Sequence, residues 1–251
     1  AQSSEVVFVL PGQGSVGPGA VHDLFAESAL FARALEAKAA RLGELGIPDA
    51  LELLTDRAAS PERLPRTDVQ QPLLVALQLA LASVLRRFGV DADAVVGHSV
   101  GELSAAALAG VLSEDDALEL AVRRGEAMGR APEGAMVACL GDPEPIRELV
   151  GRYPGWAVAA ENGLRHLTVA GPGDHVEDLL RGLSEIGAVG RRLSVDHAFH
   201  TEAMASAAAA VDEWAAGLRT SPTSRRWIST LDAAPMTELR PGYWGEQMLA
   251  P

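Results

Sequence analysis

Residues 94–109 carry the feature that most constrains the fold, because a short apolar stretch, AVVG, leads into Gly97-His98-Ser99-Val100-Gly101 and then into the helix formers ELSAAALA. A Gly-x-Ser-x-Gly sequence between a strand and a helix is typical of a nucleophile elbow, whose small flanking residues allow a cramped turn to present the serine. The N–H groups at the start of the new helix would face negative charge that develops beside Ser99. The pattern predicts Ser99 as a nucleophile in an α/β sheet domain, with the site at the carboxyl end of a strand. The alternative is a surface serine in a glycine turn, since such pentapeptides recur by chance.

Composition limits the classes of protein that fit this chain. Its 251 residues, 48% of them hydrophobic, suit one large domain or a domain with an inserted subdomain. The net charge of −13 is spread along the sequence and argues against general binding to nucleic acid or to a membrane surface. We find no apolar run of about 18 residues and no secretory signal pattern. Cys139 is the only cysteine, which excludes a disulfide within the chain and favours a packing role. We therefore expect a cytoplasmic protein, and the absence of an initial methionine suggests a piece excised from a longer polypeptide.

The segments before the elbow predict a strand, a turn and helices. Residues 5–10 are predicted as a buried strand, and the turn Pro11-Gly12-Gln13-Gly14-Ser15 follows it. This turn lacks the lysine of a phosphate-binding loop and the third glycine of a dinucleotide fingerprint, so nucleotide hydrolysis is not expected. Residues 21–46 are predicted to be helical. Residues 72–88 predict a buried helix with proline in its first turn.

A helix that carries two adjacent arginines follows the elbow. Ser113 and Asp116 resemble a capping box for a helix that runs to about Met128. The favourable placement of cations towards a helix C-terminus is a sufficient explanation for Arg123. Arg124 is the better candidate for a functional cation.

Residues 130–194 predict a separate small subdomain. The order of elements is strand, helix, strand, strand, helix, strand, which is the ferredoxin-like βαββαβ motif. We therefore expect an α/β-hydrolase-like large subdomain over residues 1–129 and 195–251, with residues 130–194 inserted as the small one. The cleft between the two parts would receive the substrate.

A serine hydroxyl requires a base, and the sequence offers six histidines. His98 would point to the face opposite Ser99, because neighbouring side chains alternate in a strand. His197 and His200 are the candidates, since both lie where the small subdomain would return the chain to the large one. No acidic residue stands out as a third triad member, so a Ser–His dyad with an imidazole oriented by a backbone or amide oxygen is the preferred interpretation.

Several ordered motifs together resemble one family over nearly the whole chain, namely the malonyl-CoA:acyl carrier protein transacylases and, more closely, the acyltransferase domains of polyketide synthases. The matching pieces are Pro11-Gly12-Gln13-Gly14-Ser15, Gln71-Pro72, Gly97-His98-Ser99-Val100-Gly101-Glu102, Arg124, Glu161-Asn162-Gly163 and His197-Ala198-Phe199-His200. Val16 and Leu164 depart from the family pattern without removing a catalytic group. The resemblance also implies a further closing segment after residue 251, which puts completeness of the sheet in question.

The resemblance assigns roles to these residues. Ser99 would be acylated from a coenzyme A thioester with His200 as general base, and the backbone N–H groups of Gln13 and Val100 would form the oxyanion hole. Arg124 would hold the free carboxylate of a dicarboxylic acyl group, since a guanidinium grips a carboxylate bidentately. Further site-lining residues would be Gln71, Asn162, His197 and Phe199. For Gln71 and Asn162, the alternative is that each satisfies nearby backbone groups.

The resemblance also implies a substrate and partners. The HAFH segment is similar to the malonyl-selecting version, in which the bulk of Phe199 crowds an α-methyl group. No permanently bound cofactor and no metal are expected, with malonyl-CoA as substrate and an acyl carrier protein bringing the phosphopantetheine thiol, in some cases beside neighbouring synthase domains. Three arginine pairs are candidates for carrier docking: Arg191-Arg192, ranked first, Arg86-Arg87 and Arg225-Arg226. A serine hydrolase and a docking module without catalytic activity are the alternatives.

Overall fold

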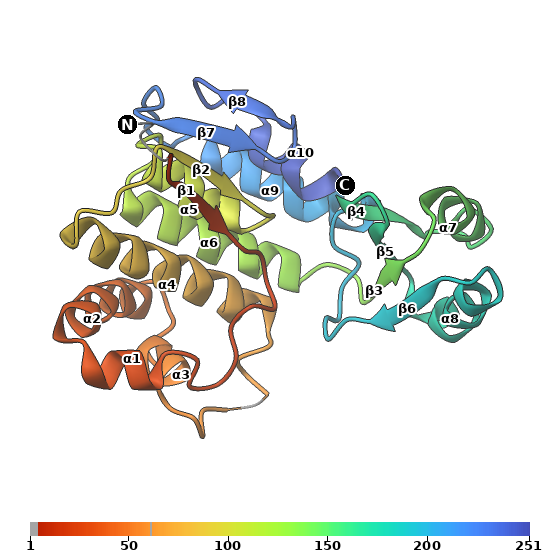
Figure 1. Ribbon diagram of the computed structural model, residues 1–251, viewed down its shortest axis with the longest axis horizontal. Helices are drawn as coiled ribbons and strands as arrows, with labels where there is room; N and C mark the ends of the chain where they lie inside the picture. The colour runs from red at the N-terminus through yellow and green to blue at the C-terminus, as the bar shows by residue number, and fades with distance from the viewer. Residues whose placement is uncertain (1–4, 61) are drawn as a thin grey trace. The chain divides into compact units, whose positions relative to one another are not determined.

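The computed structural model describes residues 5–60 and 62–251. Contacts divide the chain into two compact units. The first unit comprises the chain up to Glu126 together with Trp214–Pro241, and the second comprises Ala127–Glu213 with Gly242–Pro251. Each unit has its own four-stranded sheet (Figure 1).

The sheet of the first unit has the order β1-β2-β7-β8. Its strands are β1 (Val7–Leu10), β2 (Ala94–Gly97), β7 (Arg226–Ser229) and β8 (Ala234–Met236). The first three are parallel, and β8 pairs antiparallel with β7. Leu10 is opposite Gly97 and Val96 is opposite Ile228, so the carboxyl ends of the three parallel strands are level. The residues that follow these strands therefore emerge at one edge of the sheet, where α/β proteins place their sites.

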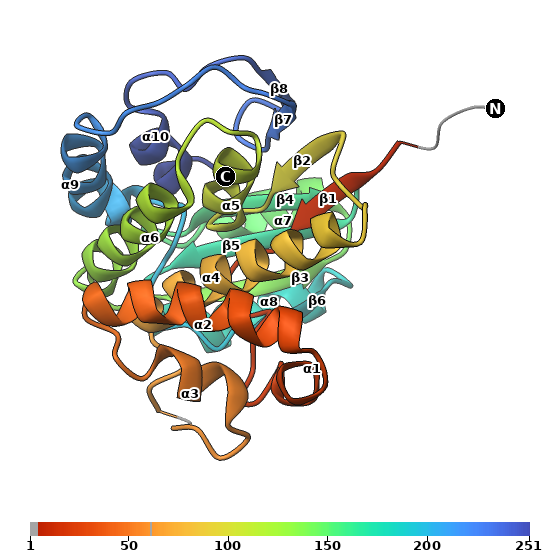
Figure 2. The ribbon, with the colours of Figure 1, turned by 90° about the vertical axis from the view of Figure 1, so that its left-hand side faces the viewer.

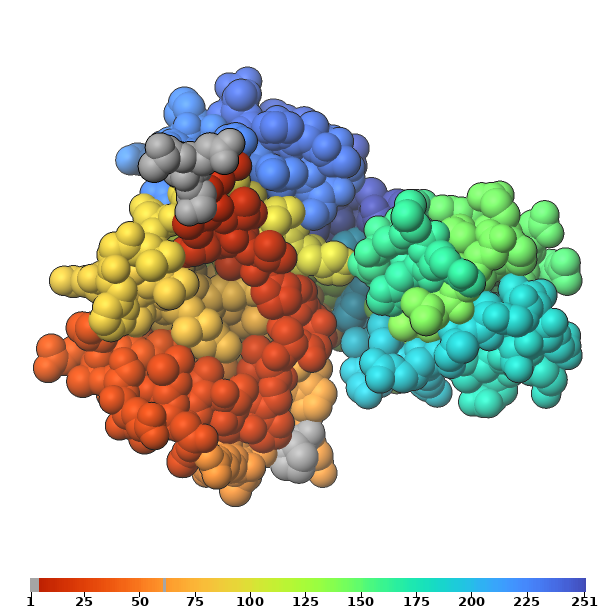
Figure 3. All heavy atoms as spheres, viewed as in Figure 1, coloured from red at the N-terminus to blue at the C-terminus, as the bar shows by residue number. Residues whose placement is uncertain are grey.

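β1 is more exposed than the sequence predicts. Val7 and Val9 are 45% and 72% exposed, whereas only Leu10 of this strand is buried. The reason is position, because β1 is at the edge of the sheet and pairs with β2 alone among the described strands. The red N-terminal segment that contains β1 lies at the surface in Figure 3. The prediction of a strand was correct, and the prediction that it is buried was wrong.

Six helices of the described chain begin between β1 and the second sheet. They are α1 (His22–Glu27), α2 (Ala29–Glu44), α3 (Ala50–Thr55), α4 (Thr67–Arg87), α5 (Gly101–Leu108) and α6 (Glu114–Gly129). The helix predicted over 21–46 is interrupted at Ser28, whose hydroxyl accepts a hydrogen bond from the Phe31 N–H at 3.3 Å and caps α2. Figure 2 shows α2 packed along α4.

α4 begins five residues before the predicted start, so Pro72 lies inside the helix and not in its first turn. The ring removes one helical hydrogen bond, the one that would reach Asp68 in the first turn, which explains why a proline this close to the N-terminus is tolerated. By length and composition α4 could span a membrane, but 72% of its apolar stretch is buried inside the protein, as in a core helix.

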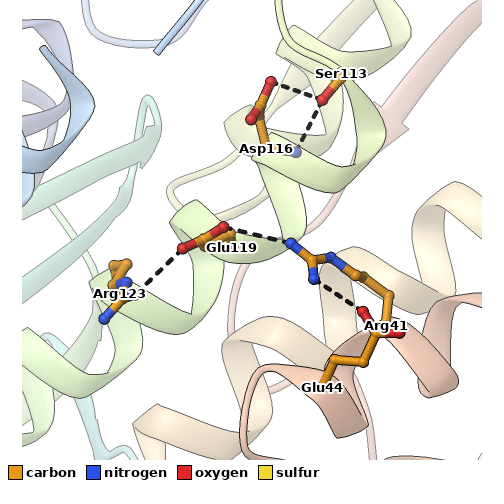
Figure 4. Close-up of polar contacts among 6 residues, drawn as sticks. All are labelled: Arg41, Glu44, Ser113, Asp116, Glu119 and Arg123. Atoms are coloured by element: carbon orange, nitrogen blue, oxygen red, sulfur yellow. Dashed lines mark hydrogen bonds and ion pairs between the residues drawn. The ribbon is translucent and has the colours of Figure 1, made fainter. Parts of the chain in front are cut away.

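The start of α6 has the predicted capping box. Ser113 Oγ accepts a hydrogen bond from the Asp116 N–H at 3.0 Å and donates one to Asp116 Oδ2 at 2.7 Å (Figure 4). Three acidic residues occupy the first turn and complement the helix dipole. The cap fixes where α6 begins and therefore which residues of α6 face inward.

The second sheet contains the predicted βαββαβ order. Its elements are β3 (Ala135–Leu140), α7 (Pro143–Val150), β4 (Ala157–Gly163), β5 (His166–Gly171), the 3-10 turn η1 (Gly173–His175), α8 (Val176–Glu185) and β6 (Val189–Arg192). The strand order is β4-β5-β3-β6, with all neighbours antiparallel. Cys139 is fully buried in the core of this unit, and burial raises the pKa of its thiol to about 12, which fits the expected packing role.

The last part of the chain is shared between the units. η2 (Glu202–Met204), α9 (Ala205–Ala215) and α10 (Tyr243–Leu249) follow β6, with β7 and β8 between α9 and α10. We expected residues 195–251 to rejoin the first sheet as one segment. β7 and β8 belong to that sheet, whereas most of α9 and all of α10 group with the second unit. The two helices contact each other, since the Gly245 N–H donates to Asp212 Oδ1 at 2.8 Å.

Candidate active site

Ser99 lies on a strained turn between β2 and α5. Its φ is +51°, in the left-handed region that residues with a side chain rarely adopt. Such strain is characteristic of functional sites, and in a nucleophile elbow it exposes the serine oxygen at the end of the strand. The local backbone is therefore that of the predicted elbow.

The two glycines of the elbow are required by close backbone contacts. A Cβ on Gly97 would lie 2.3 Å from the Glu102 nitrogen, and one on Gly101 would lie 2.1 Å from the Leu10 carbonyl oxygen. Gly12 has a similar role in the loop after β1, where a Cβ would lie 2.9 Å from Nδ1 of His98. His98 is exposed and packs over this loop, consistent with its expected role as a structural neighbour of the nucleophile.

Arg124 of α6 contacts the serine directly. Its Nη2 donates to Ser99 Oγ at 3.3 Å, and its Nη1 donates to Gln71 Oε1 at 2.7 Å. The side chain is 1% exposed. Burial lowers the pKa of Arg124 to about 10, an effect that the negative charge of Glu102 opposes, so the group is a cation at neutral pH. The site thus contains a buried positive charge within hydrogen-bond distance of the candidate nucleophile.

Side-chain amides connect Arg124 to the loop of residues 11–15 that follows β1. Gln71 Nε2 donates to Gln13 Oε1 at 3.1 Å, and Gln13 Nε2 donates to Thr67 Oγ1 at 3.3 Å. Gln71 is buried and Gln13 half-buried. The sequence left two roles open for Gln71, a lining role in the site or a hydrogen bond to nearby backbone. Its side chain contacts the side chains of two other site candidates, Gln13 and Arg124, which favours the first role.

Two further glutamines of α4 hold the same loop, and the sequence analysis missed them. Gln70 Oε1 accepts from the Gly14 N–H at 3.1 Å, and Gln78 Nε2 donates to the Pro11 carbonyl oxygen at 2.8 Å. The available signal was the recurrence of glutamine on an otherwise apolar helix, because buried polar side chains need partners. These contacts restrain the loop that carries Gln13. The other candidate oxyanion donor, Val100, directly follows Ser99 and is the N-cap residue of α5.

Arg123 has a different environment from Arg124, as expected. It is exposed and forms an ion pair with Glu119 at 3.2 Å. Glu119 also pairs with Arg41, which in turn pairs with Glu44, so this arginine belongs to a surface network (Figure 4). The two adjacent arginines therefore have different environments, one solvated and one buried beside Ser99.

His200 belongs to the second unit. Its φ is +57°, and its Nδ1 lies 3.0 Å from the carbonyl oxygen of Ala250. If Nδ1 donates this hydrogen bond, Nε2 is the basic nitrogen of the neutral ring. A backbone oxygen therefore has the orienting position that a Ser–His dyad requires.

The remaining candidates, His197, Phe199 and Asn162, are also in the second unit. His197 Nδ1 lies 3.1 Å from the Pro132 carbonyl oxygen, and its ring contacts that of buried Phe199 at 5.8 Å between centroids. Asn162 on β4 donates through Nδ2 to Thr168 Oγ1 at 3.1 Å. No cluster of side chains that could hold a metal ion occurs among the residues that the structure describes.

Comparison with known proteins places this arrangement in a family. The acyl transferase domain model matches residues 7–251. The chain is 33% identical over 253 residues to a component of the phenolphthiocerol/phthiocerol polyketide synthase of Mycobacterium tuberculosis, covering 99% of this chain and 17% of that protein. It is 39% identical over 212 residues to polyketide synthase GfsE of Streptomyces halstedii, covering 81% of this chain and 6% of that one. The chain thus spans a small part of these relatives.

Solved structures of acyltransferases resemble this chain over nearly its whole length. The acyltransferase domain from the second module of the salinomycin polyketide synthase has a TM-score of 0.88 at 35% identity, over 98% of this chain and 57% of that one. A malonyl-transacylase solved in complex with its type II polyketide acyl carrier protein has a TM-score of 0.88 at 25% identity, over 99% and 82%. With the family model covering almost the whole chain, the strained Ser99 elbow and the fold of both sheets have one assignment: this chain belongs to the acyl transferase domain family of polyketide synthases and malonyl-CoA:acyl carrier protein transacylases.

Proposed function

We propose that this protein transfers a malonyl group from malonyl-CoA to the phosphopantetheine thiol of an acyl carrier protein in polyketide biosynthesis. The observation that carries the proposal is the buried Arg124 guanidinium, which donates a hydrogen bond to Ser99 Oγ at 3.3 Å. A neutral acyl group has no use for a buried cation at this place, whereas the free carboxylate of malonyl would pair with it. A cation beside the nucleophile is the feature that favours this reaction over hydrolysis of neutral esters.

The proposed reaction has two half-reactions with a covalent intermediate. Ser99 Oγ attacks the thioester carbonyl while its proton passes to Nε2 of His200, and the N–H groups of Gln13 and Val100 stabilise the oxyanion. The tetrahedral intermediate expels CoA, which takes the proton from His200 and leaves malonyl as an ester on Ser99. The carrier thiol then attacks this ester with His200 again as base, and Ser99 recovers its proton. The cycle requires His200 to meet Ser99, and it uses no bound cofactor.

Mass spectrometry after brief mixing with malonyl-CoA tests the proposal. A malonyl adduct on Ser99 that disappears when a carrier protein is added supports the transferase. Steady release of free malonate with no adduct, at a rate that the carrier does not change, supports a serine hydrolase instead. No adduct and no release would leave only the docking-module interpretation.

Phe199 is proposed to select malonyl over methylmalonyl by its bulk. Phe199→Ser should raise the rate of methylmalonyl loading relative to malonyl loading by about tenfold, since one methylene in a pocket is worth about 1–3 kcal/mol. Loss of a buried aromatic ring will also reduce stability. Competition between the two thioesters in one reaction removes that complication, because both rates come from the same folded fraction. Phe199→Leu, which retains apolar bulk, is the control, and an unchanged ratio in Phe199→Ser would refute the steric explanation.

Arg191 and Arg192 are proposed to dock the acidic carrier. Both are exposed on the edge strand β6, and no carboxylate of the described residues forms an ion pair with either. The other candidate pairs differ, since Arg86 and Arg225 both pair with Asp91, at 3.2 and 2.5 Å. Arg226 pairs with Glu5.

Reversing both charges on β6 should weaken carrier recognition selectively. We expect Arg191→Glu/Arg192→Glu to raise the KM for the carrier by about tenfold at low salt, with less effect as salt screens the contact. Loading of Ser99 by malonyl-CoA should be unchanged. Arg33→Glu/Arg219→Glu makes the same charge change at exposed positions of the first unit, outside the three candidate pairs, and is the matched control. Equal effects of the two double variants would refute the docking assignment.

A further inference from the structure

Glu102 is a buried carboxylate for which the proposed reaction has no role. It lies in the first turn of α5, three residues after Ser99, and is 0% exposed. An ionised carboxylate in the interior is costly unless it is paired and hydrogen-bonded. Glu102 therefore requires an explanation in terms of its partners.

Thr230 holds this carboxylate in place. The Thr230 N–H donates to Glu102 Oε1 at 2.6 Å, and the Thr230 hydroxyl lies 2.5 Å from the same oxygen. The hydroxyl is also 3.1 Å from the Gly97 carbonyl oxygen. Thr230 follows β7 directly, so it links the end of that strand to both sides of the elbow around Ser99.

Glu102 and Arg124 are the only charged residues that are buried among the residues that the structure describes. Two side chains of the first unit accept hydrogen bonds from the guanidinium, Gln71 on α4 and Ser99 at the elbow. Glu102 lies next to the same serine, because its N–H donates to the Ser99 carbonyl oxygen at 3.0 Å. Of these three side chains only Glu102 is charged. Both members of the pair are excluded from solvent, at 0% and 1% exposure, so their interaction is weakly screened.

We propose that Glu102, anchored by Thr230, is a positioning residue that acts as the counter-charge of Arg124 and keeps the guanidinium directed at Ser99 before the acyl carboxylate arrives. The role of Arg124 in carboxylate binding rests on the proposed function. The counter-charge arrangement itself stands on the burial of both groups and on the contact of each with Ser99, while the Thr230 contacts fix the position of the carboxylate.

The arrangement has a consequence for pH dependence. Burial has already lowered the pKa of Arg124 to about 10, and the Glu102 charge limits that decrease. Removing the charge lowers this pKa further. Because the protonated form binds the carboxylate, loading of malonyl should be lost at lower pH when Glu102 is neutral.

The test measures how the rate of Ser99 acylation in Glu102→Gln falls as the pH rises. The rate is determined by rapid quench, once with malonyl-CoA and once with acetyl-CoA as the donor. We expect the midpoint for malonyl to move about one pH unit lower than in the parent protein, with no shift for acetyl, which has no carboxylate. Thr230→Val removes the anchoring hydroxyl and retains the Glu102 charge. It should lower the acylation rate with both donors equally and leave the alkaline midpoints for malonyl and acetyl at the same pH relative to each other as in the parent protein. A malonyl midpoint in Glu102→Gln that coincides with that of the parent would overturn the proposal.

A second measurement covers the case in which Glu102→Gln folds poorly. If the two charges are partners, Glu102→Gln should lower the melting temperature in the parent background by several degrees more than in Arg124→Gln, because the second substitution removes the charge that was left uncompensated. Equal losses in both backgrounds, or failure of both to fold, would mean a purely structural role and would also overturn the proposal. If Arg124→Gln does not discriminate malonyl from acetyl, the proposed function fails, whereas the stability comparison still decides the role of Glu102.

Discussion

Ser99→Ala is expected to abolish malonyl loading, with the rate of covalent adduct formation lowered by at least about 10³-fold, since removal of the nucleophile leaves only the binding and oxyanion groups. Alanine has the same backbone restriction as serine at the positive φ of this turn, so the elbow should still form. The measurement is the intact mass of the protein, and the transfer of label to a carrier, after mixing with malonyl-CoA. Far-ultraviolet circular dichroism would show that the fold is retained.

Ser104→Ala is the matched control for this experiment. Ser104 lies five residues later on α5, is fully buried, and its hydroxyl has no hydrogen-bond partner among the described residues. The same change there should leave adduct formation within about twofold. An adduct that forms on Ser99→Ala at the rate of the parent protein would show that another residue is the nucleophile.

Arg124→Gln is expected to reduce malonyl loading by about 10²–10³-fold, because loss of one partner of a buried charge pair costs about 3–4 kcal/mol. The glutamine retains a donor for Gln71 and removes the charge that would meet the acyl carboxylate. Loading from acetyl-CoA should change by less than about threefold, so the ratio of acetyl to malonyl adducts rises. Competition between the two thioesters, read by mass spectrometry, gives this ratio directly.

Arg123→Gln provides the control on the same helix. Arg123 is exposed and pairs with Glu119, so its loss should affect neither donor and should cost little stability. If both arginine variants reduced malonyl loading equally, the carboxylate would be recognised through the general charge of α6 and not through the buried guanidinium. Equal loss of malonyl and acetyl loading in Arg124→Gln would instead assign Arg124 to the structure of the elbow.

Features set by neighbouring residues could be predicted from the sequence. The elbow at Ser99, the capping box at Ser113 and the order of elements in the second unit all depend on backbone preference or periodicity over a few residues. The different environments of Arg123 and Arg124 also followed from a resemblance and a helical pattern. The structure agrees with each of these.

Features that depend on distant parts of the chain could not be predicted. The exposure of Val7 and Val9 follows from the place of β1 at the edge of the sheet, and strand order is not encoded within β1. The early start of α4 depends on polar residues whose side chains contact the loop after β1, including Gln70 and Gln71. Periodicity of apolar residues gives no indication of such a start.

The sequence by itself determined that a serine stands on a strained strand-to-helix turn and that a small βαββαβ unit follows, because φ preference and side-chain periodicity are local properties of the chain. Only the tertiary structure decided that Arg124 donates to Ser99 and that Thr230 contacts Glu102, a residue 128 positions away. Those contacts depend on the register of β2 against β7 and on how α6 packs, which arise when distant segments bury their apolar faces together.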